Sequence, residues 1–289
     1  MLLHNTKTLP PSMVIPRAVK RFAKSIQFIN PKLAMRFADK LFRTPVAFQI
    51  PEREKMMWKS AQKKRIKINS LNIEIDVLSY GYSTKKVLLV HGWSGRSTQL
   101  FMVADKLLEK GYMVISFDAP AHGKSEGKQT SLPEFLEVIK QLNTDFGPFE
   151  SAVGHSLGGM ALYNSAHFLQ LKSFVTIGAG NKISTIIKRF NENLGLKPKT
   201  GVLLKEYYNT IFNKDVDSLA SYQHCNAIKI PVLVIHDTQD GDVSVSCAKN
   251  IRQNLEKGSL LLTQGLGHTK ILRDKYTMNR VVDFIKSNP

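Results

Sequence analysis

The sequence predicts an α/β fold with a mostly parallel central sheet and helices on both faces. Short apolar runs alternate with segments of helical period from about Arg65 onward. Continuous apolar runs are typical of strands buried on both faces, and helices between them connect parallel strands. The chain has 289 residues, of which 43% are hydrophobic, enough for one large core.

Residues 1–64 precede this alternation and are expected to form a basic helical segment. Apolar residues recur at steps of three and four on both sides of Pro31, which indicates amphipathic helices. Residues 1–70 contain 16 Lys and Arg but only 3 Asp and Glu, within a net charge of +18 for the chain. We expect the apolar stripe to pack on the rest of the protein. Contact with an anionic membrane through residues 1–60 is the alternative, and no nucleic-acid-binding motif is present.

The α/β part is expected to begin with a β-hairpin, residues 65–69 and 71–80, because apolar and polar residues alternate in both arms. Residues 181–223 interrupt the later alternation and have apolar content of their own, which predicts a helical cap inserted between core segments 65–180 and 224–289. The other expected strands are 87–90, 112–117, 149–153, 173–177, 232–236 and 259–262, and the expected helices are 97–110, 132–146, 157–169, 243–256 and 275–287.

Residues capable of chemistry follow five of the expected strands. In open α/β sheets, ligands bind beyond the carboxyl ends of the strands, so these strand-end segments are expected to converge at one edge. The segments are HGWSG from His91, DAPAHG from Asp118, GHSLG from Gly154, DTQD from Asp237 and GLGH from Gly265.

Ser156 is the central residue of a G-x-S-x-G sequence between an expected strand and an expected helix. A serine hydroxyl needs a base within reach and an acid that orients the base. His268 can be that base and Asp240 that acid, in the chain order that this motif predicts. The N–H of Leu157, at the start of the helix, is free to donate to an oxyanion.

The segments HGWSG, GHSLGG, DTQDGDV and GLGH, in this order, resemble those of the α/β-hydrolase family over residues 66–289. The resemblance implies an esterase, lipase or thioesterase that needs no metal or organic cofactor. It also implies that the N–H of Trp93 joins that of Leu157 in the oxyanion hole.

Asp237 and Asp242 lie near Asp240 and are alternative acids. The resemblance favours Asp240, which keeps the family spacing before Val243, although Ser244 stands where many relatives have proline. Structural rather than catalytic roles are expected for His91, Asp118, His122 and His155.

The sequence therefore predicts a serine hydrolase that cleaves a small-molecule carboxylic ester or thioester through an acyl-enzyme at Ser156. Two other interpretations stay open: a low-turnover or non-catalytic ligand- or lipid-surface-binding protein, and a serine peptidase or amidase. We expect a cytoplasmic protein with membrane association as an option. Two cysteines make no disulfide framework, and we find neither a signal-peptide pattern nor an apolar run near 20 residues.

Overall fold

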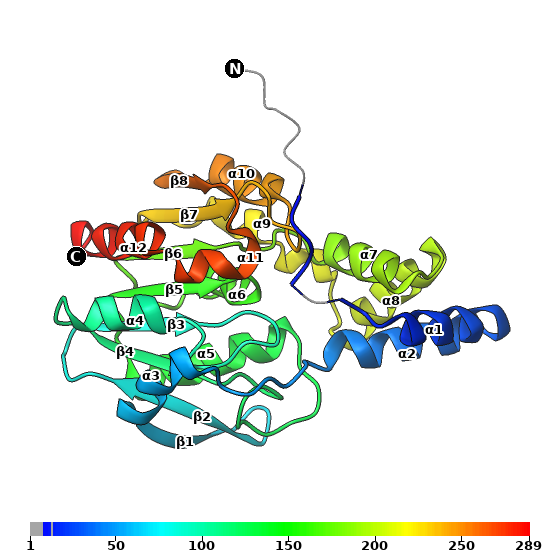
Figure 1. The fold of residues 1–289 in the computed structure, drawn as a ribbon, viewed down its shortest axis with the longest axis horizontal. Coiled ribbons are helices and arrows are strands. Elements are labelled where there is room, and N and C mark those ends of the chain that lie inside the picture. The colour runs from blue at the N-terminus through cyan, green and yellow to red at the C-terminus, as the bar shows by residue number, and fades with distance from the viewer. Residues whose placement is uncertain (1–7, 13) are drawn as a thin grey trace.

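The computed structural model describes residues 8–12 and 14–289 and contains an eight-stranded sheet with helices on both faces (Figure 1). The strand order is β1-β2-β4-β3-β5-β6-β7-β8. Strand β2 (Ile73–Tyr80) pairs antiparallel with β1 (Gln62–Ile68) and with β4 (Met113–Phe117), and the other pairs are parallel. The predicted opening hairpin and mostly parallel sheet are confirmed.

The centre of the sheet consists of strands whose residues are almost all buried. These strands are β3 (Lys86–Val90), β5 (Ser151–His155), β6 (Ser173–Ile177) and β7 (Val232–Asp237). Their continuous apolar runs fit a position between two helical layers. Strand β8 (Gly258–Thr263) forms one edge and is largely exposed.

Helices on each face of the sheet enclose a separate apolar core. On one face α5 (Leu132–Phe146), α6 (Leu157–Ser165) and α10 (Val245–Asn254) contribute to the core. On the other face the core includes α4 (Phe101–Leu108) and α12 (Lys275–Ser287). The short helices are η1 (Glu52–Glu54), α3 (Lys55–Ser60), η2 (Val216–Leu219), α9 (Ser221–Cys225), α11 (Gly267–Lys270) and η3 (Ile271–Arg273).

Several element bounds differ from those predicted. The helix expected over residues 97–110 begins only at Phe101, because Ser97 and Thr98 instead hydrogen-bond to acidic side chains elsewhere. Strand β5 extends to His155, two residues beyond its predicted end. Strand β1 begins at Gln62, inside the segment expected to be helical, because Gln62 already pairs with β2.

The residues between β6 and β7 are mostly helical, and the interpretation of 181–223 as an inserted cap stays a prediction. Helices α7 (Ile183–Leu194) and α8 (Pro198–Ile211) pack against α1 (Arg17–Ile29) and α2 (Pro31–Arg43) in a third apolar cluster. Figure 1 shows these four helices projecting from one end of the sheet.

The apolar stripes of α1 and α2 contribute to this third cluster, and their Ala23, Ala34 and Ala38 are fully buried. This confirms the expected packing for the described part of the basic segment. Residues 1–7 and 13 of that segment lie outside the described residues. Within 8–12 and 14–289, no helix has the length and hydropathy needed to cross a membrane.

Candidate active site

Ser156 lies at a sharp turn between β5 and α6. Its φ of 52° and ψ of −115° are rarely adopted by a residue other than glycine. The Ser156 N–H donates to the carbonyl of Ile177 at 2.9 Å. A Cβ at Gly158 would overlap the carbonyl oxygens at the end of β3, so glycine allows α6 to begin this close to the sheet. This is the strand–turn–helix geometry that exposes a nucleophile.

The loop after β3 lies directly against this turn. A Cβ at Gly92 would come within 2.8 Å of His155 Nδ1 and 2.9 Å of Ser156 Cβ. Across the described chain, neither the N–H of Trp93 nor that of Leu157 donates to a protein acceptor. Two unpaired amides near one serine can serve as an oxyanion hole.

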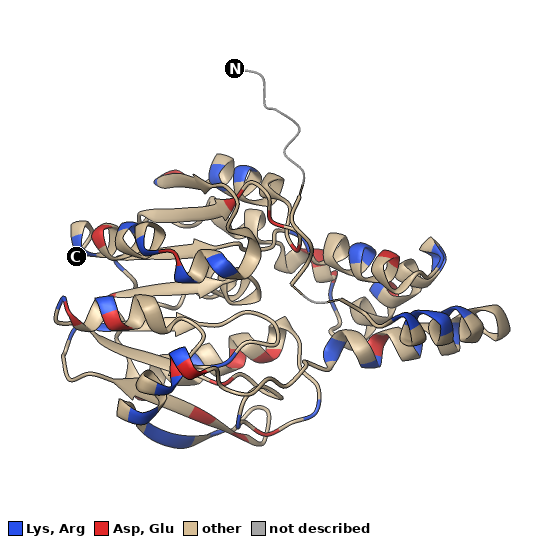
Figure 2. Ribbon diagram, in the orientation of Figure 1, with Lys and Arg blue, Asp and Glu red and all other residues tan. Residues whose placement is uncertain are grey.

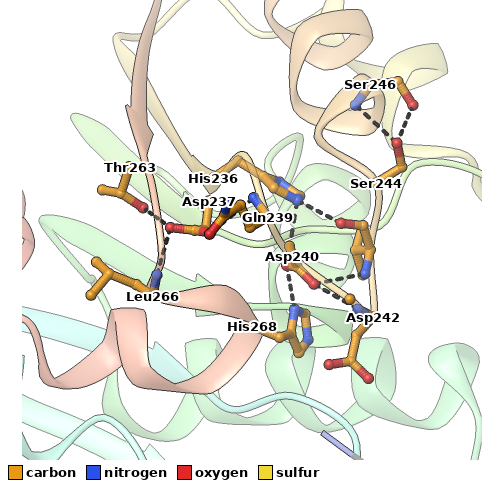
Figure 3. A network of polar contacts seen from close by, with 12 residues as sticks. His236, Asp237, Gln239, Asp240, Asp242, Ser244, Ser246, Thr263, Leu266 and His268 are labelled. Carbon is orange, nitrogen blue, oxygen red and sulfur yellow. Dashed lines mark hydrogen bonds and ion pairs between the residues drawn. The ribbon is translucent and has the colours of Figure 1, made fainter. Parts of the chain in front are cut away.

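His268 and Asp240 meet at the same edge of the sheet (Figure 3). His268 Nδ1 donates to Asp240 Oδ2 at 2.7 Å, and Asp240 Oδ1 accepts the N–H groups of Asp242 at 2.8 Å and Val243 at 2.9 Å. The Asp240 side chain is 1% exposed. A neutral His268 with its proton on Nδ1 keeps Nε2 available as a base.

Asp240 is an ionised carboxylate despite its burial. Burial alone would raise its pKa, but the hydrogen bond from His268, the positive charge of that ring when it is protonated and the Val243 amide hold the pKa below the ordinary value of aspartate. A charged acid of this kind can orient the imidazole and stabilise its protonated form.

The two alternative acids have other partners. Asp237 Oδ2 accepts from the Thr263 hydroxyl at 2.8 Å and the Leu266 amide at 3.0 Å, which ties the ends of β7 and β8 together. The Asp242 carboxylate accepts from the Ser12 amide at 2.8 Å. Of the three carboxylates, only Asp240 forms a hydrogen bond with His268.

Ser156 and His268 both lie at the end of β6. The Ser156 amide bonds to Ile177, and a Cβ at the next residue, Gly178, would be 3.2 Å from the His268 ring. No hydrogen bond between Ser156 Oγ and His268 is found among the described residues. The structure therefore pairs the predicted acid and base and places the predicted nucleophile at their edge without linking it to the base.

Two further histidines support this pair. His155 Nε2 donates to the backbone carbonyl of His268 at 3.0 Å, with ring centroids 4.7 Å apart, and burial lowers the pKa of His155 to about 3. His236 Nε2 donates to the Val243 carbonyl at 2.9 Å and lies 3.4 Å from Asp240 Oδ2. The sequence does not single out His236, whose one signal is its place at the end of a strand.

Buried histidines also hold the loops of the site together. His122 Nε2 accepts from the Ser94 amide at 3.0 Å, and His91 Nε2 accepts from the Ala119 amide at 3.0 Å. Burial lowers the pKa of His91 to about 4 and that of His122 to about 3, so both rings are neutral acceptors. Asp118 accepts from the Ser97 amide at 2.6 Å. These contacts fit the structural roles expected for His91, His122 and Asp118, and that none of the three takes part in catalysis stays a prediction.

A buried ion pair holds the far end of the loop after β3 in place. The Glu54 carboxylate receives two hydrogen bonds of 2.7 Å from Arg96 and one of 2.8 Å from the Thr98 hydroxyl. The Glu54 side chain is 3% exposed and that of Arg96 is 12% exposed. This pair could not be predicted from the sequence, because nothing in the spacing of the two residues indicates contact.

The segment Thr8–Ser12 lies across the loops that carry Asp240 and His268. The Leu9 N–H donates to the Gln239 carbonyl at 2.8 Å. A Cβ at Gly267 would be 3.1 Å from Leu9 Cδ1. With the Ser12 contact to Asp242, these interactions join the N-terminal segment to the edge of the site.

The strained serine turn, the acid–base pair and the parallel sheet together define an α/β hydrolase. A model of the α/β hydrolase family matches residues 87–237, more than half of the sequence, and the chain belongs to this family.

Similar proteins have the same fold at low identity. The chain is 21% identical over 201 residues to a monoacylglycerol lipase of Mycolicibacterium smegmatis, covering 55% of this chain and 71% of that protein. An esterase of Pyrococcus furiosus superposes with a TM-score of 0.63 at 20% identity, over 85% of this chain and 98% of that one. A monoacylglycerol lipase of Paleococcus ferrophilus superposes with a TM-score of 0.59 at 18% identity, over 74% and 99%.

Proposed function

We propose that this protein is a serine hydrolase that cleaves a carboxylic ester or thioester through an acyl-enzyme at Ser156. The observation that carries the proposal is the position of Ser156 in a strained turn beside two unpaired amides. The Asp240–His268 hydrogen bond at the same sheet edge supports it. Strained backbone of this kind persists where function needs it.

In the proposed mechanism, Ser156 Oγ attacks the acyl carbon while His268 Nε2 takes its proton. The oxyanion receives hydrogen bonds from the amides of Leu157 and Trp93. Protonated His268 then donates its proton to the departing alcohol or thiol, and Asp240 stabilises the positive charge. Water attacks the acyl-enzyme, with His268 again as the base, and releases the acid and free Ser156. Catalytic hydrogen bonds often form only with substrate bound, which accommodates the missing Ser156–His268 contact.

The substrate class is drawn from the residues and from the relatives. Monoacylglycerol lipases and esterases among the similar proteins favour an acyl ester. Amides use the same machinery, so a peptidase or amidase is distinguished by assay. Assays separate these classes if they compare nitrophenyl esters, monoacylglycerols and acyl-CoA thioesters of increasing acyl length with peptide anilides.

The direct test compares Ser156→Ala with Ser259→Ala, a change at an exposed serine on the edge strand. We expect the first variant to lose ester hydrolysis by about 10⁴-fold or more and the second to retain it. A labelled fluorophosphonate should attach at Ser156 and not at Ser94 or Ser125. Turnover retained by Ser156→Ala would refute the assignment.

A second candidate is a fold that binds an acyl ligand with little turnover. The observation in its favour is that Ser156 and His268 form no hydrogen bond in the described chain. This candidate predicts that the native protein turns over no activated ester and resists the fluorophosphonate, yet binds fatty-acyl probes.

A further inference from the structure

The turn between α1 and α2 exposes a group of large apolar side chains. Phe28 is 94% exposed and Ile29 is 78% exposed, while Phe22 and Leu33 on either side are also exposed. Other apolar residues of α1 and α2, such as Ala23, are buried against α7 and α8. Phe28 and Ile29 therefore form an apolar tip outside the core, flanked along the helices by the exposed Phe22 and Leu33, a feature that marks an interaction site.

Positive charge lies along the two helices that lead to this apolar tip. Residues 17–43 contain eight Lys and Arg and one acid, Asp39, which is bound by Arg43 and Tyr208. Figure 2 shows the basic residues gathered on α1. The following have no ion-pair partner within the described residues: Arg17, Lys20, Arg21, Lys24, Lys32, Arg36 and Lys40.

The loop between α7 and α8 brings further charge to the tip. The Lys197 amide donates to the Gln27 side chain at 3.1 Å, one residue before Phe28. A Cβ at Gly195 would come within 2.7 Å of Lys24 Cε, so α1 lies directly on this loop. Lys197 and Lys199 are exposed there.

We infer that the α1–α2 tip is a docking surface for a bilayer rich in anionic phospholipid. Phe28 and Ile29 enter the headgroup and upper acyl region, and the lysines and arginines around them lie at the level of the phosphates. A small apolar tip on a projecting turn, with Lys24, Lys32 and the Lys197 loop close by and further unpaired basic residues along the helices, suits this shallow insertion. A protein partner would instead call for a broad, shaped apolar surface. The inference does not depend on the chemistry of Ser156.

The test uses the full-length protein and vesicles of phosphatidylcholine alone or with 30 mol% phosphatidylserine. We expect co-sedimentation with the anionic vesicles only, weakened by high salt. The double variant Phe28→Ser/Ile29→Ser should lower the partition coefficient at least tenfold. Lys24→Gln/Lys32→Gln should lower it by roughly fivefold for each charge removed. In Phe28→Trp, the fluorescence emission of the new tryptophan should shift to shorter wavelength when anionic vesicles are added.

Matched controls change similar residues elsewhere. Tyr82→Ser removes an aromatic that is 87% exposed, and Lys110→Gln/Lys257→Gln removes two exposed lysines before β4 and β8. Both should bind vesicles as the native protein does, and circular dichroism should show all variants folded. The inference is wrong if anionic vesicles do not bind the native protein, or if tip and control variants bind equally. It is also wrong if the tip variants change only the oligomeric state, from dimer to monomer, and not vesicle binding. A further contrary result is that DNA fully displaces the protein from anionic vesicles while Phe28→Ser leaves vesicle binding unchanged.

Discussion

Asp240 illustrates how a single side chain depends on its surroundings. Both of its oxygens are occupied, by two amides on one side and His268 on the other, and almost none of its surface meets water. A buried carboxylate that lost one of these partners would retain its charge without compensation. Its ionised state and its contact with His268 therefore depend on each other.

Replacement of Asp240 by Asn should lower kcat for an activated ester by about 10³-fold or more, because an amide cannot fix the His268 tautomer or stabilise its positive charge. The matched control is Asp242→Asn. Asp242 is two residues away, contacts Ser12 and does not bond to His268, so its variant should retain activity within about twofold of the native protein. Steady-state kinetics measure kcat for both variants. An equal loss of kcat in Asp240→Asn and Asp242→Asn would contradict the role of Asp240 as the acid that orients His268.

The sequence predicted residues whose roles follow from position along the chain. Ser156, Asp240 and His268 each follow a strand, and parallel strands bring their carboxyl ends to one edge. Glu54 and Arg96 could not be found this way, because their contact joins a short helix to a loop 42 residues later. His236 was also missed, because its hydrogen bond to Val243 arises from how the acid loop folds back.

At the scale of elements, η1 acts on the loop after β3 through one ion pair. Glu54→Ala would leave Arg96 charged and nearly buried without a partner. We expect this change to lower the free energy of unfolding by about 3 kcal/mol, as measured by urea denaturation. It should also reduce esterase activity, because Arg96 lies three residues after Trp93.

The control for Glu54→Ala lies in the same turn of helix. Glu52 pairs with Lys55, but its side chain is 84% exposed, and exposed ion pairs contribute little to stability. Glu52→Ala should therefore leave the urea midpoint and the activity unchanged. Equal destabilisation by both variants would show that η1 itself, and not the buried pair, supports the loop.

The segment Thr8–Ser12 gives a second prediction at this scale. A Cβ at Gly241 would meet the Pro10 carbonyl carbon at 2.8 Å, so Gly241→Ala should displace the segment from the acid loop. Hydrogen exchange should show faster exchange of the Leu9 amide, which otherwise bonds to Gln239. Gly111→Ala is the control, because a Cβ there meets no neighbour although its φ of 78° strains alanine, and it should leave Leu9 exchange unchanged.

Element order was predictable because the period of apolar residues reports local structure. Helices α5 and α12 match their predicted ranges, since each has a continuous apolar face and a clear boundary. Boundaries set by distant contacts were not predictable. The helix expected from Ser97 starts late because Asp118, just after the neighbouring strand β4, accepts a hydrogen bond from the Ser97 amide.

At the scale of the whole molecule, the excess of basic residues and the buried histidines of the site lie in different parts of the chain. The basic residues concentrate at the N-terminal end, while the site contains neutral histidines away from water. His91, His122 and His155 are each at most 3% exposed. The hydrogen bonds of His91 and His122 connect the loops after β3 and β4 to each other, and that of His155 connects the end of β5 to α11.

These three histidines should make stability sensitive to mild acid. Burial lowers the pKa of His91 to about 4 and that of His122 and His155 to about 3, whereas an unfolded histidine titrates near 6.5. Below pH 6.5 the unfolded chain therefore binds more protons, and the free energy of unfolding falls with falling pH.

Three such groups give a slope of about 4 kcal/mol per pH unit between pH 5.5 and 4.5. Aspartates with lowered pKa values add their effect only below about pH 4. Burial also lowers the pKa values of His236 and His224, which add to this slope. Urea denaturation at pH 7.0, 6.0, 5.5, 5.0 and 4.5 measures the slope, and His155→Gln should reduce it by about 1.4 kcal/mol per pH unit. A free energy of unfolding that stays constant across this range would mean that these rings accept protons in the folded state.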